Sequence, residues 1–186
     1  SLEFGASVNY KKNFSYFVGG DSKFYYSNID NKKNISFIKI DLKKNFKVKS
    51  NLYENILIYN VVEHLDNHSN TFSEINRILK KNGNLFGSTP FLYQVHGAPK
   101  DYFRFTKDFF LEKLKKSGFK KIRIKCMGFG PFVASFSLIQ TYTKYLPLLN
   151  HIILLLCYFL DYILQLFIKT KLKEIYPIGI FFIGKK

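Results

Sequence analysis

The chain has 186 residues, of which 47% are hydrophobic and 18% aromatic, so its composition excludes a disordered protein and allows one substantial core. The net charge of +16 suggests nucleic-acid binding, but only three of the 29 basic residues are arginines, the side chain favoured for base and phosphate recognition. We therefore expect a solvated lysine surface and no nucleic-acid partner, with an anionic membrane surface as the second use of the charge.

The first part of the chain alternates short apolar segments with polar breaks. Residues 1–4 read as a buried strand that stops at Gly5, and because this strand comes so early we expect that the natural N-terminus precedes Ser1. Two further segments, 23–29 and 35–40, are rich in aromatic and β-branched residues and each is followed by an aspartate. They predict two strands that end on carboxylates.

The middle of the chain predicts a strand, a helix and another strand. Residues 55–62 form a β-branched run, as in a parallel strand buried on both faces, and a Glu-His pair follows it. Residues 70–81 have the apolar spacing of an amphipathic helix, for which Asn82 and Gly83 predict the C-cap. A short strand is expected over 85–88.

The later elements continue the alternation. Thr106 is a good N-cap for a helix over 107–116, and the segments 120–126 and 178–183 predict two more strands. The pattern indicates a single α/β domain over residues 1–186 with a largely parallel sheet, whose ligands bind at the carboxyl ends of the strands.

An apolar helical insertion over residues 130–174 interrupts this pattern. Its centre, 152–160, has no charged residue, and four polar positions nearby are spaced to share one helical face: Asn150, Asp161, Gln165 and Lys169. We interpret the insertion as one or two helices that make peripheral membrane contact through residues 145–173, with lysines reaching the headgroups. The alternative is a helical cap buried against the domain or against a second subunit.

The two cysteines, Cys126 and Cys157, lie in apolar surroundings without metal-type spacing. They predict core thiols in a reducing compartment, hence a cytoplasmic protein, at the inner face of the membrane if the insertion meets lipid. No metal site is expected.

Several blocks together resemble class I S-adenosylmethionine-dependent methyltransferases, in particular the branch whose fourth strand ends in Glu-His. They are LEFGAS at 2–7, SNID at 27–30, FIKIDL at 37–42, NVVEHL at 60–65, EINRILKKNGNLFGSTPF at 74–91, HGAPKDYFRFT at 96–106 and YPIGIFFIGKK at 176–186. The resemblance implies a Rossmann-like seven-stranded, mostly parallel sheet with an antiparallel last strand. It also implies S-adenosyl-L-methionine as the cofactor.

The same resemblance implies a cofactor site at the strand ends. Asp30 would accept from the ribose hydroxyls and Asp41 from the adenine amino group; for both, a plain turn residue is the alternative. The other cofactor positions implied are Glu3, Gly5, Ala6, Leu42, Asn60 and Val61.

For the methyl acceptor, the resemblance points to the loop after the fifth strand. His96 is the expected base, because its ordinary pKa is near neutrality, and Asp101 would orient its ring. The substrate-binding positions implied are Glu63, His64, Tyr102 and Arg104. The alternative is a polar network that only holds the loop.

The predicted function is methyl transfer to a small-molecule, glycan or lipid-linked acceptor. The alternative is a catalytically inactive, membrane-associated binding protein on the same scaffold. It is motivated by the loop after the first strand, where Gly5 is the only glycine and the stiff Val8 follows.

Overall fold

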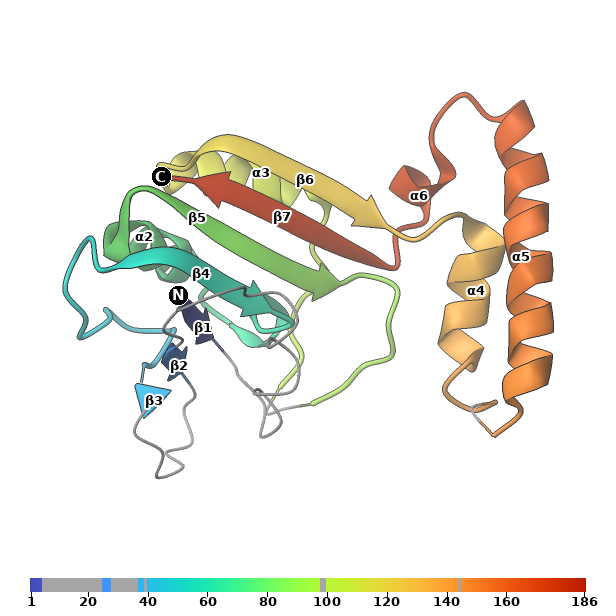
Figure 1. Cartoon of the computed structure of the whole chain (residues 1–186), viewed down its shortest axis with the longest axis horizontal. Helices are drawn as coiled ribbons and strands as arrows, with labels where there is room; N and C mark the ends of the chain where they lie inside the picture. The colour runs from blue at the N-terminus through green and yellow to red at the C-terminus, as the bar shows by residue number, and fades with distance from the viewer. Residues whose placement is uncertain (5–24, 28–36, 39, 98–99, 144) are drawn as a thin grey trace, which may run out of the picture.

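The computed structural model describes residues 1–4, 25–27, 37–38, 40–97, 100–143 and 145–186. Its centre is one sheet with the strand order β3-β2-β1-β4-β5-β7-β6 (Figure 1). The strands are β1 (Leu2–Phe4), β2 (Tyr25–Ser27), β3 (Phe37–Ile38), β4 (Tyr53–Tyr59), β5 (Leu79–Pro90), β6 (Lys120–Met127) and β7 (Gly179–Lys185). Pairings among β1 to β5 are parallel, whereas β7 runs antiparallel to β5 and β6. The expected α/β sheet with an antiparallel last strand is therefore present.

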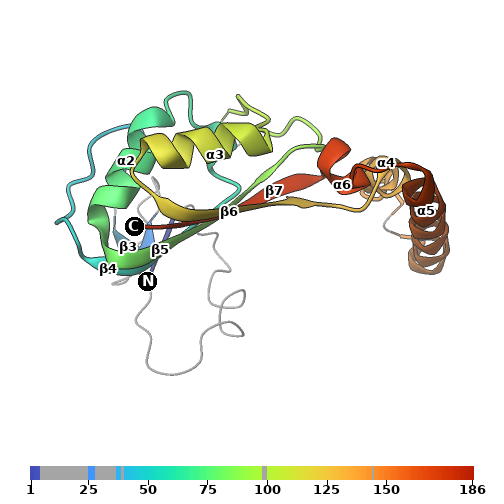
Figure 2. The ribbon, with the colours of Figure 1, turned by 90° about the horizontal axis from the view of Figure 1, so that it is seen from above.

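Two helices cover one face of this sheet, α2 (Ser69–Ile78) and α3 (Lys107–Lys116), as Figure 2 shows. Their apolar residues meet the sheet in an aromatic cluster in which Phe72, Phe110 and Phe182 are fully buried. The ring centroids of Phe110 and Phe182 are 4.4 Å apart and nearly parallel. Burial of each such ring contributes about 1.5–3 kcal/mol, so this cluster fixes α2 and α3 on the sheet.

The start of β5 corrects the predicted helix end. The helix stops at Ile78 and β5 begins at once with Leu79, so Asn82 and Gly83 lie inside the strand and do not cap the helix. The register between β4 and β5 shifts here; Asn82 has a φ of 67°, and a Cβ on Gly83 would lie 2.8 Å from the Glu54 carbonyl oxygen. The Asn-Gly pair predicts a helix C-cap but forms part of a β-bulge. Both structures require residues with the same backbone freedom.

Other predicted bounds agree more closely with the structure. Thr106 is the N-cap of α3, and its Oγ1 accepts a hydrogen bond from the Phe109 amide, as expected. The strands β6 and β7 occupy the predicted segments. The strand β4 ends at Tyr59, three residues earlier than predicted, because the chain turns at Asn60.

The insertion forms three helices, α4 (Pro131–Ile139), α5 (Pro147–Phe167) and the short α6 (Leu172–Ile175). We call residues 131–167 the helical hairpin. It stands beyond the ends of β6 and β7, with α5 packed along α4 (Figures 1 and 2). Most large apolar side chains of α5 are exposed, so the alternative of a cap buried against the sheet is wrong.

Candidate active site

The site begins at Asn60, where β4 ends. Asn60 has a φ of 51°, a left-handed conformation that asparagine tolerates better than most residues, and its amide donates to the Ser88 carbonyl at 2.8 Å. The turn redirects the chain into the 3-10 helix η1 (Val62–His64). The left-handed residue thus places Glu63 and His64 beside the carboxyl ends of β4 and β5.

Glu63 is fully buried, and neither of its carboxylate oxygens has a hydrogen-bond partner among the described residues. Burial raises the pKa of Glu63, since desolvation disfavours its charged form. The His64 Nε2 atom lies 3.9 Å from Glu63 Oε1, and His64 Nδ1 lies 2.7 Å from the Lys100 carbonyl oxygen. Because a carbonyl can only accept, Nδ1 carries a proton, and Nε2 is the ring nitrogen that faces Glu63.

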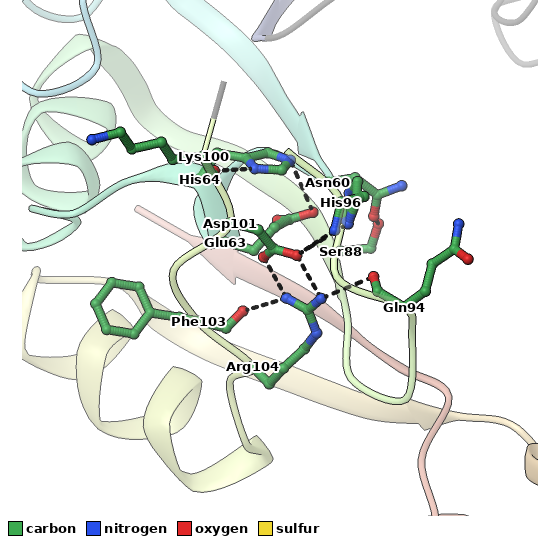
Figure 3. A network of polar contacts seen from close by, with 10 residues as sticks. All are labelled: Asn60, Glu63, His64, Ser88, Gln94, His96, Lys100, Asp101, Phe103 and Arg104. Atoms are coloured by element: carbon green, nitrogen blue, oxygen red, sulfur yellow. Dashed lines mark hydrogen bonds and ion pairs between the residues drawn. The ribbon is translucent and has the colours of Figure 1, made fainter. Parts of the chain in front are cut away.

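The loop after β5 brings a second polar group to the same place (Figure 3). Asp101 accepts from the His96 amide at 3.0 Å, and its Oδ2 atom lies 3.2 Å from His96 Nδ1. Arg104 holds both oxygens of the same carboxylate, with Nη2 2.7 Å from Oδ2. This bidentate hydrogen bonding holds the pKa of Asp101 well below its usual range. Asp101 is therefore an anion that binds the His96 amide and lies within ion-pair distance of its ring.

Main-chain bonds join the two segments. The amides of Tyr102 and Phe103 both donate to the Glu63 carbonyl, at 2.9 and 3.3 Å. The rings of His64 and His96 meet edge to face with centroids 5.0 Å apart. The structure therefore brings together six residues predicted to act on the acceptor: Glu63, His64, His96, Asp101, Tyr102 and Arg104.

A pocket of about 380 Å³ opens beside this cluster. Asp101 and Arg104 line one part of it, aromatic and aliphatic side chains of residues 91–95 line another, and Leu138 of α4 reaches it from the hairpin. The pocket thus combines a charged wall with an apolar one, as an amphiphilic ligand would require.

The predicted cofactor positions are described only in part, since Gly5, Ala6 and Asp30 lie outside the described residues. Glu3 is buried at the end of β1, and its Oε2 atom has no hydrogen-bond partner among the described residues. Burial raises the pKa of Glu3 to about 7. An unsatisfied carboxylate at the carboxyl end of a central strand suits a ligand that brings a hydrogen-bond donor.

The segment around Asp41 has the contacts of a turn. Asp41 Oδ1 accepts from the Lys43 amide at 3.0 Å, and the Leu42 carbonyl accepts from Thr71 Oγ1 at 2.8 Å. Lys43 extends from this turn over the Tyr102 ring, 5.9 Å from its centroid, so the Asp41 segment does lie next to the acceptor loop. Val61, between Asn60 and η1, packs against the core.

Two features of the site were not predicted from the sequence. His68 lies among the rings of Phe103, Phe105 and Phe109, where burial lowers its pKa, so it supports the loop from below. In addition, one ligating atom each from Glu63, His64 and His96 lie within 4.8 Å of one another. His64 and His96 are separated by 31 residues, and only the adjacent ends of β4 and β5 bring them together, so the sequence did not reveal this cluster.

Comparison with known proteins agrees with this geometry. Residues 10–87 match the sequence model of a family described as a methyltransferase domain. A search of curated protein sequences gives no significant match.

Solved structures of the same fold cover the whole chain. An S-adenosylmethionine-dependent methyltransferase from Archaeoglobus fulgidus matches with a TM-score of 0.62 and 14% identity, over 100% of this chain and 85% of that one. Phosphoethanolamine N-methyltransferase 2 from Haemonchus contortus, in complex with phosphomonomethylethanolamine and S-adenosylhomocysteine, matches at 0.61 and 15%, over 100% and 48%. The [4+2]-cyclase SpnF matches at 0.63 and 11%, over 100% and 74%. At these identities the likeness establishes the fold.

Proposed function

We propose that this chain, which carries a methyltransferase-family domain on the fold of the S-adenosylmethionine-dependent enzymes, transfers a methyl group to an acceptor bound beside Asp101 and Arg104. The observation that carries the proposal is the ordered His96–Asp101–Arg104 group at the carboxyl end of β5, next to a pocket. The cofactor of this family is S-adenosylmethionine, which supplies a methyl group already activated on a sulfonium.

The residues of this chain have two tasks in such a transfer. Glu3 and Asn60, at the ends of β1 and β4, would hold the cofactor from below, and the pocket would hold the acceptor in line with the methyl carbon. His96 would accept the proton that the acceptor gives up when it takes the methyl group, and the sulfonium chemistry of the cofactor would leave the electron pair of the former S–C bond on sulfur. Asp101 would keep the His96 ring in position for this step.

Replacement of His96 by alanine tests this assignment. We expect His96→Ala to reduce turnover by at least about 100-fold while the affinity for S-adenosylhomocysteine stays the same. His151→Ala, at an exposed histidine of α5, is the matched control. Unchanged turnover in His96→Ala removes this residue from the mechanism. Absence of any calorimetric signal with S-adenosylmethionine would instead favour the second candidate, a binding protein without catalysis, which the single glycine after the first strand motivates.

We further propose that the acceptor lies at a lipid surface, because the helical hairpin buries polar side chains and exposes apolar ones. Two polar side chains of α5 are turned inward: Asp161 accepts from the Phe132 and Val133 amides at 3.0 and 2.9 Å, and Asn150 pairs with Thr143. The outer face is apolar and exposed, and its largest members are Leu148, Ile152, Leu155, Leu156, Phe159, Tyr162, Leu166 and Phe167. A hydrocarbon environment favours this arrangement, since polar groups there must be satisfied internally.

Charge and length support lipid as the occupant of this face. Among residues 145–173, the charged side chains other than buried Asp161 are Lys169, Lys171 and Lys173, all exposed at the end of α5. Such lysines suit anionic headgroups. Of the described helices, α5 alone is long and apolar enough to cross a membrane by length and composition. Since Leu138 of α4 also lines the pocket, an acceptor with an apolar tail would reach Asp101 from the hairpin side.

Vesicle flotation tests the lipid proposal. We expect the chain to float with vesicles that contain phosphatidylglycerol and the double variant Leu155→Asp, Leu166→Asp to remain in solution. Leu52→Asp, at an exposed leucine just before β4, is the control and should float normally. Equal flotation of both variants overturns the proposal. A stable dimer without vesicles, lost in the double variant, would assign the face to a second copy of the chain.

A further inference from the structure

Glu63, His64 and His96 form a compact set of side chains whose ligating atoms all lie within 4.8 Å (Figure 3). Glu63 supplies a fully buried carboxylate whose two oxygens lack any partner among the described residues. A buried carboxylate without a partner among the described residues is costly, and a bound cation would offset that cost.

His64 is held as metal-binding histidines usually are. The Nδ1–H group of His64 donates to the Lys100 carbonyl oxygen at 2.7 Å, which leaves Nε2 on the side of Glu63. The His96 ring lies beside Asp101, with Nδ1 3.2 Å from Oδ2, and Arg104 fixes that carboxylate. An acceptor on the far nitrogen fixes the tautomer and orientation of an imidazole and makes it a better ligand.

We propose that Glu63, His64 and His96 bind a divalent transition-metal cation. Two nitrogen ligands and one oxygen ligand suit Zn²⁺, Mn²⁺, Fe²⁺ or Co²⁺, whereas Mg²⁺ and Ca²⁺ prefer oxygen ligands. Ligands of a tetrahedral ion stand about 3.4 Å apart, so the 3.9 Å between His64 and Glu63 needs only a small inward movement. Three protein ligands leave a position open toward a further ligand.

The cation changes how the proposed methyl transfer is supported at this site. An acceptor hydroxyl on the open position would lose its proton to solvent water more readily beside a divalent charge, and His96 would then serve as a ligand in place of a base. This inference deepens the proposed function at the same residues, so the two need separate readouts. Metal binding can be measured without any methyl transfer.

Titration of the tag-free, chelator-treated chain tests the site. We expect calorimetry with ZnCl₂ to show one site per chain, and CoCl₂ to give the visible absorption of a bound Co²⁺ ion. Glu63→Gln and His96→Ala should each weaken binding by at least about 100-fold, since each removes one of three ligands. His151→Ala removes an exposed histidine of the hairpin and should leave binding unchanged.

Circular dichroism and the thermal midpoint of each variant show whether it is folded, and Glu63→Gln keeps the shape of the side chain. Absence of saturable binding to the wild-type chain at millimolar metal, or equal binding by folded Glu63→Gln, overturns the metal site. Turnover that survives the chelator also overturns a catalytic cation and leaves His96 as the base. Loss of turnover in the chelator, restored by one metal, supports the site.

Discussion

The sheet domain and the helical hairpin bury opposite kinds of side chain. In the core between the sheet and its two covering helices, large rings such as Phe72 of α2 and Phe110 of α3 are fully buried, and charged residues lie mainly outside. In α5, the buried residues are Asn150 and Asp161, while Leu155 and Leu166 are more than half exposed. Both regions are amphipathic, so hydropathy spacing alone does not say which face of a helix is inside. The available partner decides, and among the described elements the main partner of α5 is α4.

The largest difference between the two regions should appear when the same residue type is truncated in each. Phe110 is fully buried and stacks on Phe182, so Phe110→Ala should lower the free energy of unfolding by about 3–5 kcal/mol. Phe167, at the end of α5, is 82% exposed, and Phe167→Ala should change the free energy of unfolding by no more than about 0.5 kcal/mol.

Urea unfolding followed by circular dichroism measures both variants. Equal destabilisation by the two would mean that α5 is buried in solution, against a second copy of the chain for instance. Addition of vesicles should leave the Phe110→Ala deficit in place, because that side chain lies in the sheet core.

The next largest effect concerns the hairpin alone. Asp161→Ala leaves the Phe132 and Val133 amides at the start of α4 without an acceptor, which should cost the hairpin about 2 kcal/mol. The two cysteines report on the two regions separately, because Cys157 lies on α5 and Cys126 is buried in β6. Thiol labelling of Cys157 should accelerate by roughly 30-fold while labelling of Cys126 stays the same, since 1.4 kcal/mol corresponds to a factor of ten. Equal acceleration at both thiols would show that the hairpin unfolds with the sheet.

The sequence predicted most of the sheet because the signals there are local. Thr106 caps α3 as expected, and the runs that became β6 and β7 needed only their own alternation of residues to be recognised. The Asn82–Gly83 pair misled because a helix C-cap and a β-bulge both require residues that accept a left-handed or crowded backbone. The unusual backbone conformation at Asn82–Gly83 can be predicted from these two residues, but whether they end a helix or lie in a strand depends on the pairing of β5 with β4.

In the candidate site too, contacts between residues near in sequence could be predicted, and contacts that depend on the strand order could not. The pairs His96–Asp101 and Glu63–His64 are near in sequence, so their contacts could be anticipated. The approach of His64 to His96 could not, because it depends on β4 and β5 being neighbours in the sheet. The inward direction of Asp161 was equally hidden, since nothing in its own helix shows that α4 presents free amides to it.

A smaller effect on stability is expected from a difference between two buried carboxylates, Glu3 in the sheet and Asp161 in the hairpin. Asp161 has two amide donors, whereas Glu3 Oε2 has no partner among the described residues, and burial raises the pKa of Glu3 to about 7 from an ordinary 4.5. The folded state therefore favours the protonated form of Glu3. Its contribution to stability is fully present below about pH 4.5 and is lost as the pH rises through about 7.

Glu3→Gln removes this titration and should make the chain more stable than wild type at pH 8.5 by about 1–2 kcal/mol, with little difference at pH 4.5. The expected gain is smaller than the full pKa shift implies because water reaches part of the carboxylate. Urea unfolding at the two pH values gives the difference, with Glu112→Gln at an exposed glutamate of α3 as the control. A difference that does not vary with pH would mean that Glu3 has a donor after all, and that the sheet satisfies its buried carboxylate as fully as the hairpin satisfies Asp161.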